Sequence, residues 1–154
     1  MLKAKDIMCR NVFTVSPDSG ITETVAILLE KRINGLPVVD KKGRLQGIIC
    51  QSDLIAQQKR VPIPSVFALL GGLIPLQSPR DLEKEVEKIA AIRVSQAMTT
   101  NPVTVTPETP LEEIATLMVE KKYHTLPVIE DGKLVGIIGK EDVLKTLMGK
   151  KEGD

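Results

Sequence analysis

The sequence has few of the residues on which catalytic, metal and nucleic-acid sites usually depend. Its 154 residues include one His, two Cys, one Tyr, two Phe and no Trp. These residues form no set with the spacing of a metal site, and no nucleophile–base pair is visible. So few aromatic side chains cannot build the stacking surfaces that bind single-stranded nucleic acid. We therefore expect a protein that is not an enzyme and that has neither a metal nor a cofactor.

Long apolar runs and an excess of either charge are also missing. The 21 basic residues balance 20 acidic ones, so the charge favours neither nucleic acid nor an anionic membrane as a partner. The longest apolar run, residues 66–76, contains Gly71, Gly72 and Pro75 and falls short of the ~20 residues that span a bilayer. The N-terminal residues lack the apolar segment of a signal peptide. Two Cys are too few for a disulfide framework, and we predict a cytoplasmic protein.

The main positive feature is an internal repeat. Residues 45–54, Leu-Gln-Gly-Ile-Ile-Cys-Gln-Ser-Asp-Leu, correspond to residues 134–143, Leu-Val-Gly-Ile-Ile-Gly-Lys-Glu-Asp-Val. In both copies an acid, Asp53 or Asp142, stands six places after the Gly, at the expected start of a helix. Acids are favoured at helix starts in any case, so this position alone does not indicate a ligand. The correspondence extends back to residues 11–17 and 101–107 at an offset of ninety residues. Each copy has a size that is marginal when folded alone, so the two should share a core.

Each copy is predicted to fold as strand, helix, strand, strand and helix, after a short helical lead-in at residues 4–8 or 94–98. The first strand is expected at residues 12–15, followed by a helix that Ser19 caps. In the second copy, Thr109-Pro110-Leu111-Glu112 has the pattern of a capping box. Hairpins are expected at residues 36–49 and 126–138, and final helices at residues 52–58 and 141–148. The predicted organisation is a first repeat at 1–58, a helical insert or linker at 59–93, a second repeat at 94–150 and a tail at 151–154.

The insert belongs to neither copy. Its prolines and glycines break it into short pieces, and a helix is expected to begin near Ser78. One interpretation is a crossover helix that covers part of the core. The other is that the apolar residues 66–70 form a docking surface for a partner or a second subunit.

The order of these motifs resembles a tandem pair of CBS domains, the regulatory Bateman module. The resemblance covers residues 4–58 and 94–148, nearly everything except the insert. It implies an α/β fold of the α+β type, in which two β-α-β-β-α repeats pack about a pseudo-twofold axis and leave two clefts. Such pairs commonly dimerise into a flat disc. Their clefts often bind adenosine ligands such as AMP, ADP, ATP or S-adenosylmethionine.

The resemblance also assigns residues to the two clefts. The family's ribose motif, Ser/Thr-x-x-Asp, falls on Cys50-x-x-Asp53 and Gly139-x-x-Asp142, so both carboxylates are kept and both hydroxyls are lost. The cleft that we call the Asp53 cleft would contain Asp53, Cys50, Val103, Tyr123, His124 and Thr125. The other, the Asp142 cleft, would contain Asp142, Gly139, Phe13, Ile33, Asn34 and Gly35.

The sequence favours the Asp53 cleft as the one that binds a nucleotide. It has a compact Val103, the aromatic edge of Tyr123 and the only His, whereas the bulky Phe13 is expected to fill or narrow the Asp142 cleft. His124 matches a position that contacts phosphate in the γ subunit of AMP-activated protein kinase. A lone His in a turn is more often simply solvated.

The predicted function is that of a free-standing regulatory module, which binds an adenosine nucleotide between its repeats and signals to a separate target protein. A homodimer is expected. The alternative is a structural or protein-interaction disc with degenerate, ligand-free clefts. The sequence does not specify the nucleotide, the number of occupied clefts or the target.

Overall fold

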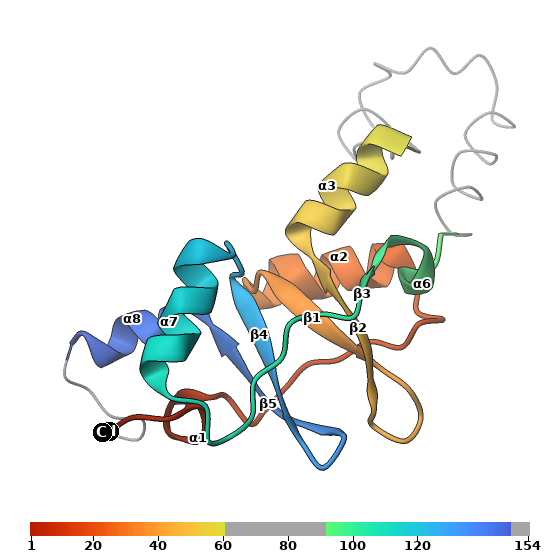
Figure 1. Ribbon diagram of the computed structural model, residues 1–154. Helices are drawn as coiled ribbons and strands as arrows, with labels where there is room; N and C mark the ends of the chain where they lie inside the picture. Colours follow the sequence, from red (N-terminus) through yellow and green to blue (C-terminus); the bar gives the residue numbers. More distant parts are fainter. Residues whose placement is uncertain (61–91, 149–154) are drawn as a thin grey trace, which may run out of the picture.

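A computed structural model describes residues 1–60 and 92–148 of the chain, and the elements within these ranges alternate helices with antiparallel hairpins (Figure 1). In chain order they are α1 (Ala4–Ile7), α2 (Ile21–Lys31), β1 (Gly35–Val39), β2 (Leu45–Cys50), α3 (Gln51–Arg60), α6 (Val94–Ala97), β3 (Thr99–Thr100), α7 (Leu111–Glu120), β4 (Thr125–Glu130), β5 (Lys133–Gly139) and α8 (Lys140–Thr146). The predicted α+β fold class is confirmed. The insert helix near Ser78 and the apolar residues 66–70 lie outside the described ranges.

One antiparallel hairpin forms the centre of each repeat, as the sequence predicted: β1–β2 in the first and β4–β5 in the second. Leu36 pairs with Ile49 across β1 and β2, and Leu126 pairs with Ile138 at the equivalent place across β4 and β5. All four of these side chains are fully buried. The tight turn of the second hairpin places Gly132 at a φ of 78°, a conformation that glycine adopts without a steric cost. The position of the hydrophobic residues and the turn together fix the register.

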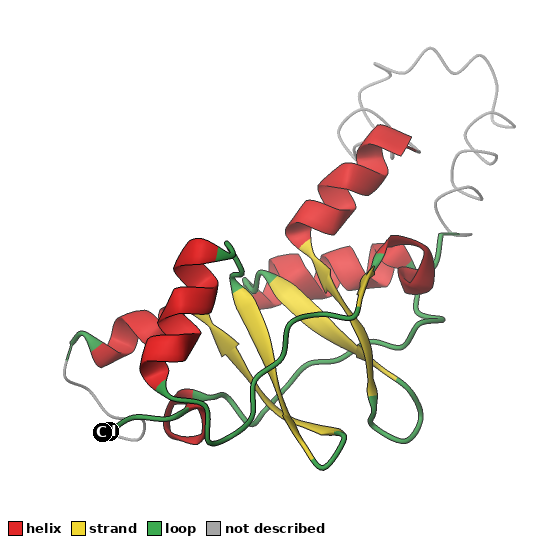
Figure 2. Cartoon of the chain, viewed as in Figure 1, coloured by secondary structure: helices red, strands yellow, loops and turns green. Residues whose placement is uncertain are grey.

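The first strand predicted in each repeat is wrong. Residues 12–15 contribute a single parallel bridge between Val15 and Val38, and Val105 bridges Val128 in the same way. Figure 2 accordingly shows the chain between α1 and α2 as a loop. The β-branched residues of this stretch favour a strand, but only Val15 and Val105 lie against a neighbouring strand and become buried.

The two lead-in helices exchange places between the repeats. Ala4 and Ile7 of α1 and the following residue, Met8, lie in the core of the second repeat, with Ile114 and Leu126 among others. Conversely, residues of α6 pack in the first repeat's core with α2 and the β1–β2 hairpin. Figure 1 shows α1 beside α7 and β5, and α6 beside one end of α2. Each repeat therefore completes its core with a helix that the sequence places in front of the other repeat.

Backbone hydrogen bonds hold the exchanged helices in place. The Ala4 amide donates to the Thr109 carbonyl at 2.8 Å, and the Val94 amide donates to the Ser19 carbonyl at 2.9 Å. These contacts repeat at an offset of ninety residues, as expected for an approximate twofold relation between the halves. An ion pair adds to the first junction, where Glu108 lies 2.6 Å from the Lys3 ammonium and 2.9 Å from that of Lys5.

The glycine of each repeated motif lies where an exchanged segment crosses the hairpin. A Cβ on Gly136 would stand 2.5 Å from the Met8 sulfur, and a Cβ on Gly47 would stand 2.6 Å from the Thr99 carbonyl oxygen. Both contacts are closer than a side-chain carbon normally approaches. The repeated Gly-Ile-Ile motif thus marks a close contact between segments distant in the sequence.

The predicted helix caps are wrong. Gly20 and Pro110 occupy the N-cap positions of α2 and α7. The hydroxyl of Ser19 accepts the Ser16 amide at 3.0 Å, and that of Thr109 accepts the Thr106 amide at 3.0 Å. Both hydroxyls therefore stabilise the turn before the helix instead of the helix itself.

Candidate functional site

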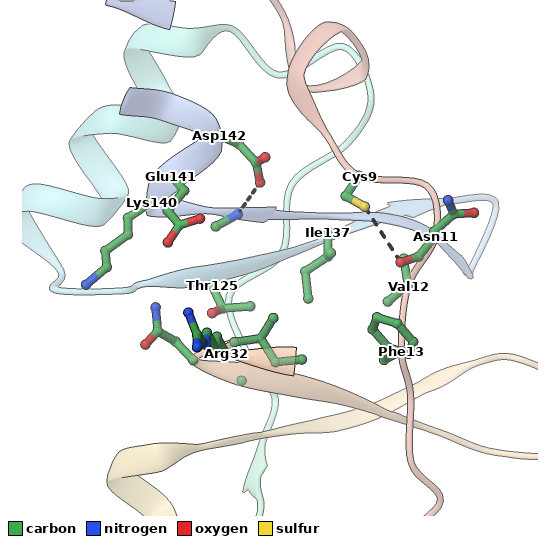
Figure 3. A pocket seen from close by; sticks show the side chains of 14 residues that line it. Cys9, Asn11, Val12, Phe13, Arg32, Thr125, Ile137, Lys140, Glu141 and Asp142 are labelled. Atoms are coloured by element: carbon green, nitrogen blue, oxygen red, sulfur yellow. Dashed lines mark hydrogen bonds between the residues drawn. The ribbon is translucent and has the colours of Figure 1, made fainter. Parts of the chain in front are cut away.

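A cavity of about 210 Å³ lies between the two repeats, at the Asp142 cleft (Figure 3). Its lining comes from four parts of the chain: the segment after α1, the end of α2 with the start of β1, the start of β4, and the β5–α8 junction. The lining residues are Cys9, Asn11, Val12, Phe13, Arg32, Ile33, Asn34, Gly35, Thr125, Ile137, Gly139, Lys140, Glu141 and Asp142. All six residues that the sequence assigned to this cleft are among them.

The carboxylate of Asp142 is fixed at one end of the cavity. Asp142 lies in the first turn of α8, and its Oδ2 accepts the Gly139 amide at 2.8 Å. The start of α8 is held further by the Lys140 amide, which donates to the His124 carbonyl at 3.2 Å. Figure 3 shows Asp142 above β5, across from Thr125 and Arg32. A carboxylate held in this way presents an acceptor to the cavity without first having to become ordered.

Phe13 forms a wall of the cavity and does not close it. Its side chain remains 47% exposed, and the Lys31 ammonium lies 5.0 Å from the centre of its ring. A cation over the face of the ring favours one ring orientation. Together with Ile33 and Ile137, Phe13 gives the cavity an apolar side on which a flat ring could pack.

The starts of β1 and β4 meet between the two clefts. A Cβ on Gly35 would stand 2.9 Å from the Cys50 sulfur and 3.4 Å from the Thr125 hydroxyl oxygen. Gly35 and Thr125 are ninety residues apart and occupy equivalent positions. Thr125, which the sequence assigned to the Asp53 cleft, lines the cavity at Asp142.

The Asp53 carboxylate is engaged within the chain through both of its oxygens. Its Oδ2 accepts the Cys50 amide at 2.8 Å, which matches the Gly139–Asp142 contact. Its Oδ1 accepts the Thr99 hydroxyl, also at 2.8 Å. The half-buried Cys50 thiol lies nearby, and its burial, followed by the negative charge of Asp53, raises its pKa to about 11. Cys50 is therefore a neutral thiol at physiological pH.

The other residues assigned to the Asp53 cleft have different surroundings. Val103 is partly buried against the core of the second repeat, so only the rest of its side chain could contact a ligand. Tyr123 is 37% exposed, and the side chain of His124 is exposed as well. The structure thus places Asp53 with Cys50 and Thr99. The preference of the sequence for this cleft stays a prediction, and the cavity favours the Asp142 cleft.

Several residues of the two clefts were missed from the sequence. One of them is Thr99, whose hydroxyl donates a hydrogen bond to Asp53. The equivalent residue of the first repeat, Cys9, lines the cavity at Asp142. The ninety-residue offset relates the two, so the repeat itself contained a signal for them. The remaining missed residues line the cavity: Asn11, Val12, Arg32, Ile137, Lys140 and Glu141.

Residues 1–60 and 92–148 contain neither a metal-binding cluster nor a helix that could span a membrane. No group of three or more His, Cys, Asp or Glu side chains in these ranges could hold a metal ion. Within the same ranges, every helix is too short or too polar to cross a membrane.

The repeated fold and the cleft between its halves agree with the comparison to known families. A model of the CBS domain matches residues 4–60 and again residues 94–149, which together make up most of the chain. The chain belongs to the CBS domain family. The two matched regions correspond to the two repeats, so the protein contains a tandem CBS pair.

Similar proteins are also CBS-pair proteins. A CBS domain-containing protein of Dictyostelium discoideum is 32% identical over 145 residues, which cover 94% of this chain and 90% of that protein. The chloroplastic protein CBSX2 of Arabidopsis thaliana is 30% identical over 148 residues, or 90% of this chain. The chain spans 60% of the length of CBSX2 and 63% of that of the related CBSX1.

Two solved structures similar to this CBS pair contain adenosine compounds. The crystal structure of CBSX2 in complex with AMP has a TM-score of 0.73 at 28% identity, covering 97% of this chain and 98% of that chain. The CBS domain pair of protein MJ0100 was solved with 5′-methylthioadenosine and S-adenosyl-L-methionine. Its TM-score is 0.70 at 26% identity, with coverage of 98% and 99%.

Proposed function

We propose that this CBS pair is a regulatory module that binds an adenosine nucleotide in the Asp142 cleft and signals its presence to a partner protein. The observation that carries the proposal is the cavity between the repeats, with a fixed carboxylate at one end and apolar residues along one side. The proposal includes no catalytic step.

The chemistry of the lining suits an adenosine ligand. The Asp142 carboxylate is an acceptor-only group and suits the two hydroxyls of a ribose. Phe13, Ile33 and Ile137 provide apolar contacts for the flat base, while the cations Arg32 and Lys140 are suited to phosphate. The AMP in the CBSX2 structure and the two adenosine compounds in that of the MJ0100 pair support this ligand class. The lining does not single out one of AMP, ADP, ATP or S-adenosylmethionine.

Replacement of the two equivalent acids tests the assignment. A hydrogen bond to a charged group contributes roughly 1.5–3 kcal/mol, so Asp142→Ala should weaken AMP or ATP binding by about tenfold or more. Asp53→Ala is the matched control, because it removes the equivalent carboxylate and the equivalent cap at the start of α3. Titration calorimetry measures both. Loss of binding in Asp53→Ala alone would reverse the assignment, and absence of binding by the unmodified protein would refute the proposed function.

We also propose that the pair forms a homodimer through its helices. Large apolar side chains are exposed at equivalent positions of the two repeats: Leu29 with Val119, at 70% and 77%, and Ile55 with Leu144, at 72% and 56%. A symmetric pair of patches suits a twofold interface between copies. Light scattering at tens of micromolar should return a dimer mass, and Val119→Lys with Leu144→Lys should lower it to that of a monomer. A monomer mass for the unmodified protein would contradict this proposal.

A second candidate is a structural or protein-interaction disc with ligand-free clefts. The engagement of Asp53 by Thr99 and the loss of both motif hydroxyls favour it. Thermal melts with and without AMP, ATP or S-adenosylmethionine separate the candidates, because only a ligand of the native state raises the midpoint.

The cytoplasmic location also stays a prediction, since CBSX1 and CBSX2 are chloroplastic proteins.

A further inference from the structure

One pair of equivalent residues near the motif acids, Thr99 and Cys9, differs in the group that it can donate. Thr99 in β3 pairs with Ile48 of β2, and Cys9 forms a bridge with Ile137 of β5 at the equivalent place. The repeat thus gives both residues the same position relative to the nearby acid. One carries a hydroxyl and the other a thiol.

The hydroxyl and the thiol have different partners. The Thr99 hydroxyl donates to Asp53 Oδ1 at 2.8 Å, whereas the Cys9 thiol donates to the Asn11 carbonyl at 3.6 Å. Figure 3 shows the thiol directed along its own segment toward Asn11. A hydroxyl is a much stronger donor than a thiol, so only Thr99 is well suited to bind a carboxylate.

We infer that Thr99 weakens ligand binding in the Asp53 cleft: its hydroxyl donates to Asp53 Oδ1 and so acts as an internal competitor for a ribose. This inference rests on the proposed function. A nucleotide entering the Asp53 cleft must displace the Thr99 hydroxyl or share the carboxylate with it. The equivalent residue of the Asp142 cleft, Cys9, has no hydroxyl, and its thiol donates to the Asn11 carbonyl.

The position of Thr99 makes the competition effective even though its side chain is exposed. The pairing of β3 with β2 fixes the Thr99 backbone, and the Cys50 amide holds the other oxygen of Asp53. Both groups are therefore already ordered, and their hydrogen bond costs little further conformational entropy. Since water also competes for exposed groups, we expect an effect of about tenfold on affinity.

The experiment measures AMP binding by calorimetry in a protein carrying Asp142→Ala, so that the Asp53 cleft is observed alone. Thr99→Val keeps the size of the side chain but removes the donor, and it should tighten AMP binding by about tenfold. Thr99→Ser is the matched control: it keeps the donor and should stay at the weak affinity of the Asp142→Ala protein. Circular dichroism confirms that each variant is folded, and Thr99→Ala replaces Thr99→Val if the latter is not.

The reciprocal change tests the Asp142 cleft. In an otherwise unmodified protein, Cys9→Thr should bind AMP about tenfold more weakly than Cys9→Ala, because only the former introduces a hydroxyl.

Equal affinities of the Val and Ser variants at Thr99, with AMP still bound by the unmodified protein, would overturn the inference and leave the proposed function intact. If the unmodified protein binds no AMP but Thr99→Val does, the inference holds and the assignment of the Asp142 cleft is wrong. If none of the proteins binds AMP, ATP or S-adenosylmethionine, both are refuted.

Discussion

The exchange of lead-in helices leads to a specific prediction for Gly136. In Gly136→Ala, the new Cβ would stand 2.5 Å from the Met8 sulfur and 2.9 Å from its Cγ, with the Cys9 carbonyl oxygen at 3.2 Å. Met8 is only 2% exposed and belongs to the core of the second repeat, so it cannot turn away into solvent. The substitution should therefore push α1 away from its site.

The expected magnitude follows from the cost of overpacking. Extra atoms in a well-packed core typically cost about 1–3 kcal/mol. For a chain of this length, each kcal/mol lowers the melting temperature by roughly 2–4 °C, so we expect a decrease of about 2–12 °C. Met is flexible and can relieve part of the clash, which favours the lower half of this range.

Thermal unfolding followed by circular dichroism provides the assay. Gly139→Ala is the matched control, because the nearest atom to its new Cβ is 3.8 Å away, an ordinary contact. Combining Gly136→Ala with Met8→Ala should give less than the sum of the two single losses, since removing the Met8 side chain relieves the clash. Equal melting temperatures for Gly136→Ala and Gly139→Ala, together with simple additivity in the double variant, would refute the described crossing.

Two further predictions concern titratable groups. Burial and the charge of Asp53 raise the pKa of the Cys50 thiol to about 11, so its alkylation should be slow at pH 8 and become faster up to about pH 11. Mass spectrometry locates the label. Rapid labelling of Cys50 at pH 8 would contradict the raised pKa. Hydrogen bonds from Lys3 and Lys5 lower the pKa of Glu108 to about 2, below its unfolded value, so their stabilisation is complete above about pH 4.5 and is lost as the pH falls through about 2. The difference in melting temperature between the unmodified protein and Glu108→Gln should be small, because the pair is exposed, and should shrink over this window and in high salt; a constant difference would exclude the ion pair as its cause.

The local elements could be predicted from the sequence because their signals are local. The Ile-Ile runs, the turn at Gly132 and the acids at Asp53 and Asp142 each determine structure within a few residues. The predicted hairpins and final helices agree with the structure to within one or two residues at most of their ends. Helix α8 ends two residues before the predicted position.

The exchanged helices and the cleft chemistry depend on contacts between distant residues. Nothing near Ala4 indicates that α1 completes the core of the second repeat. Likewise, the bond from Thr99 to Asp53 joins residues 46 positions apart, and only the pairing of β3 with β2 brings them together. The bulk of Phe13 led to the expectation that it fills or narrows the Asp142 cleft, but whether a ring fills or lines a cavity depends on its orientation, which the sequence does not show.

The exchange of α1 and α6 also determines how the chain can be divided. A cut between the repeats would not release two complete domains, because each fragment would carry a helix that belongs to the core of the other. Each fragment alone would lack buried residues such as Met8 or Val94. The cooperative folding unit is therefore the pair, and neither repeat can gain or lose its structure without affecting the other.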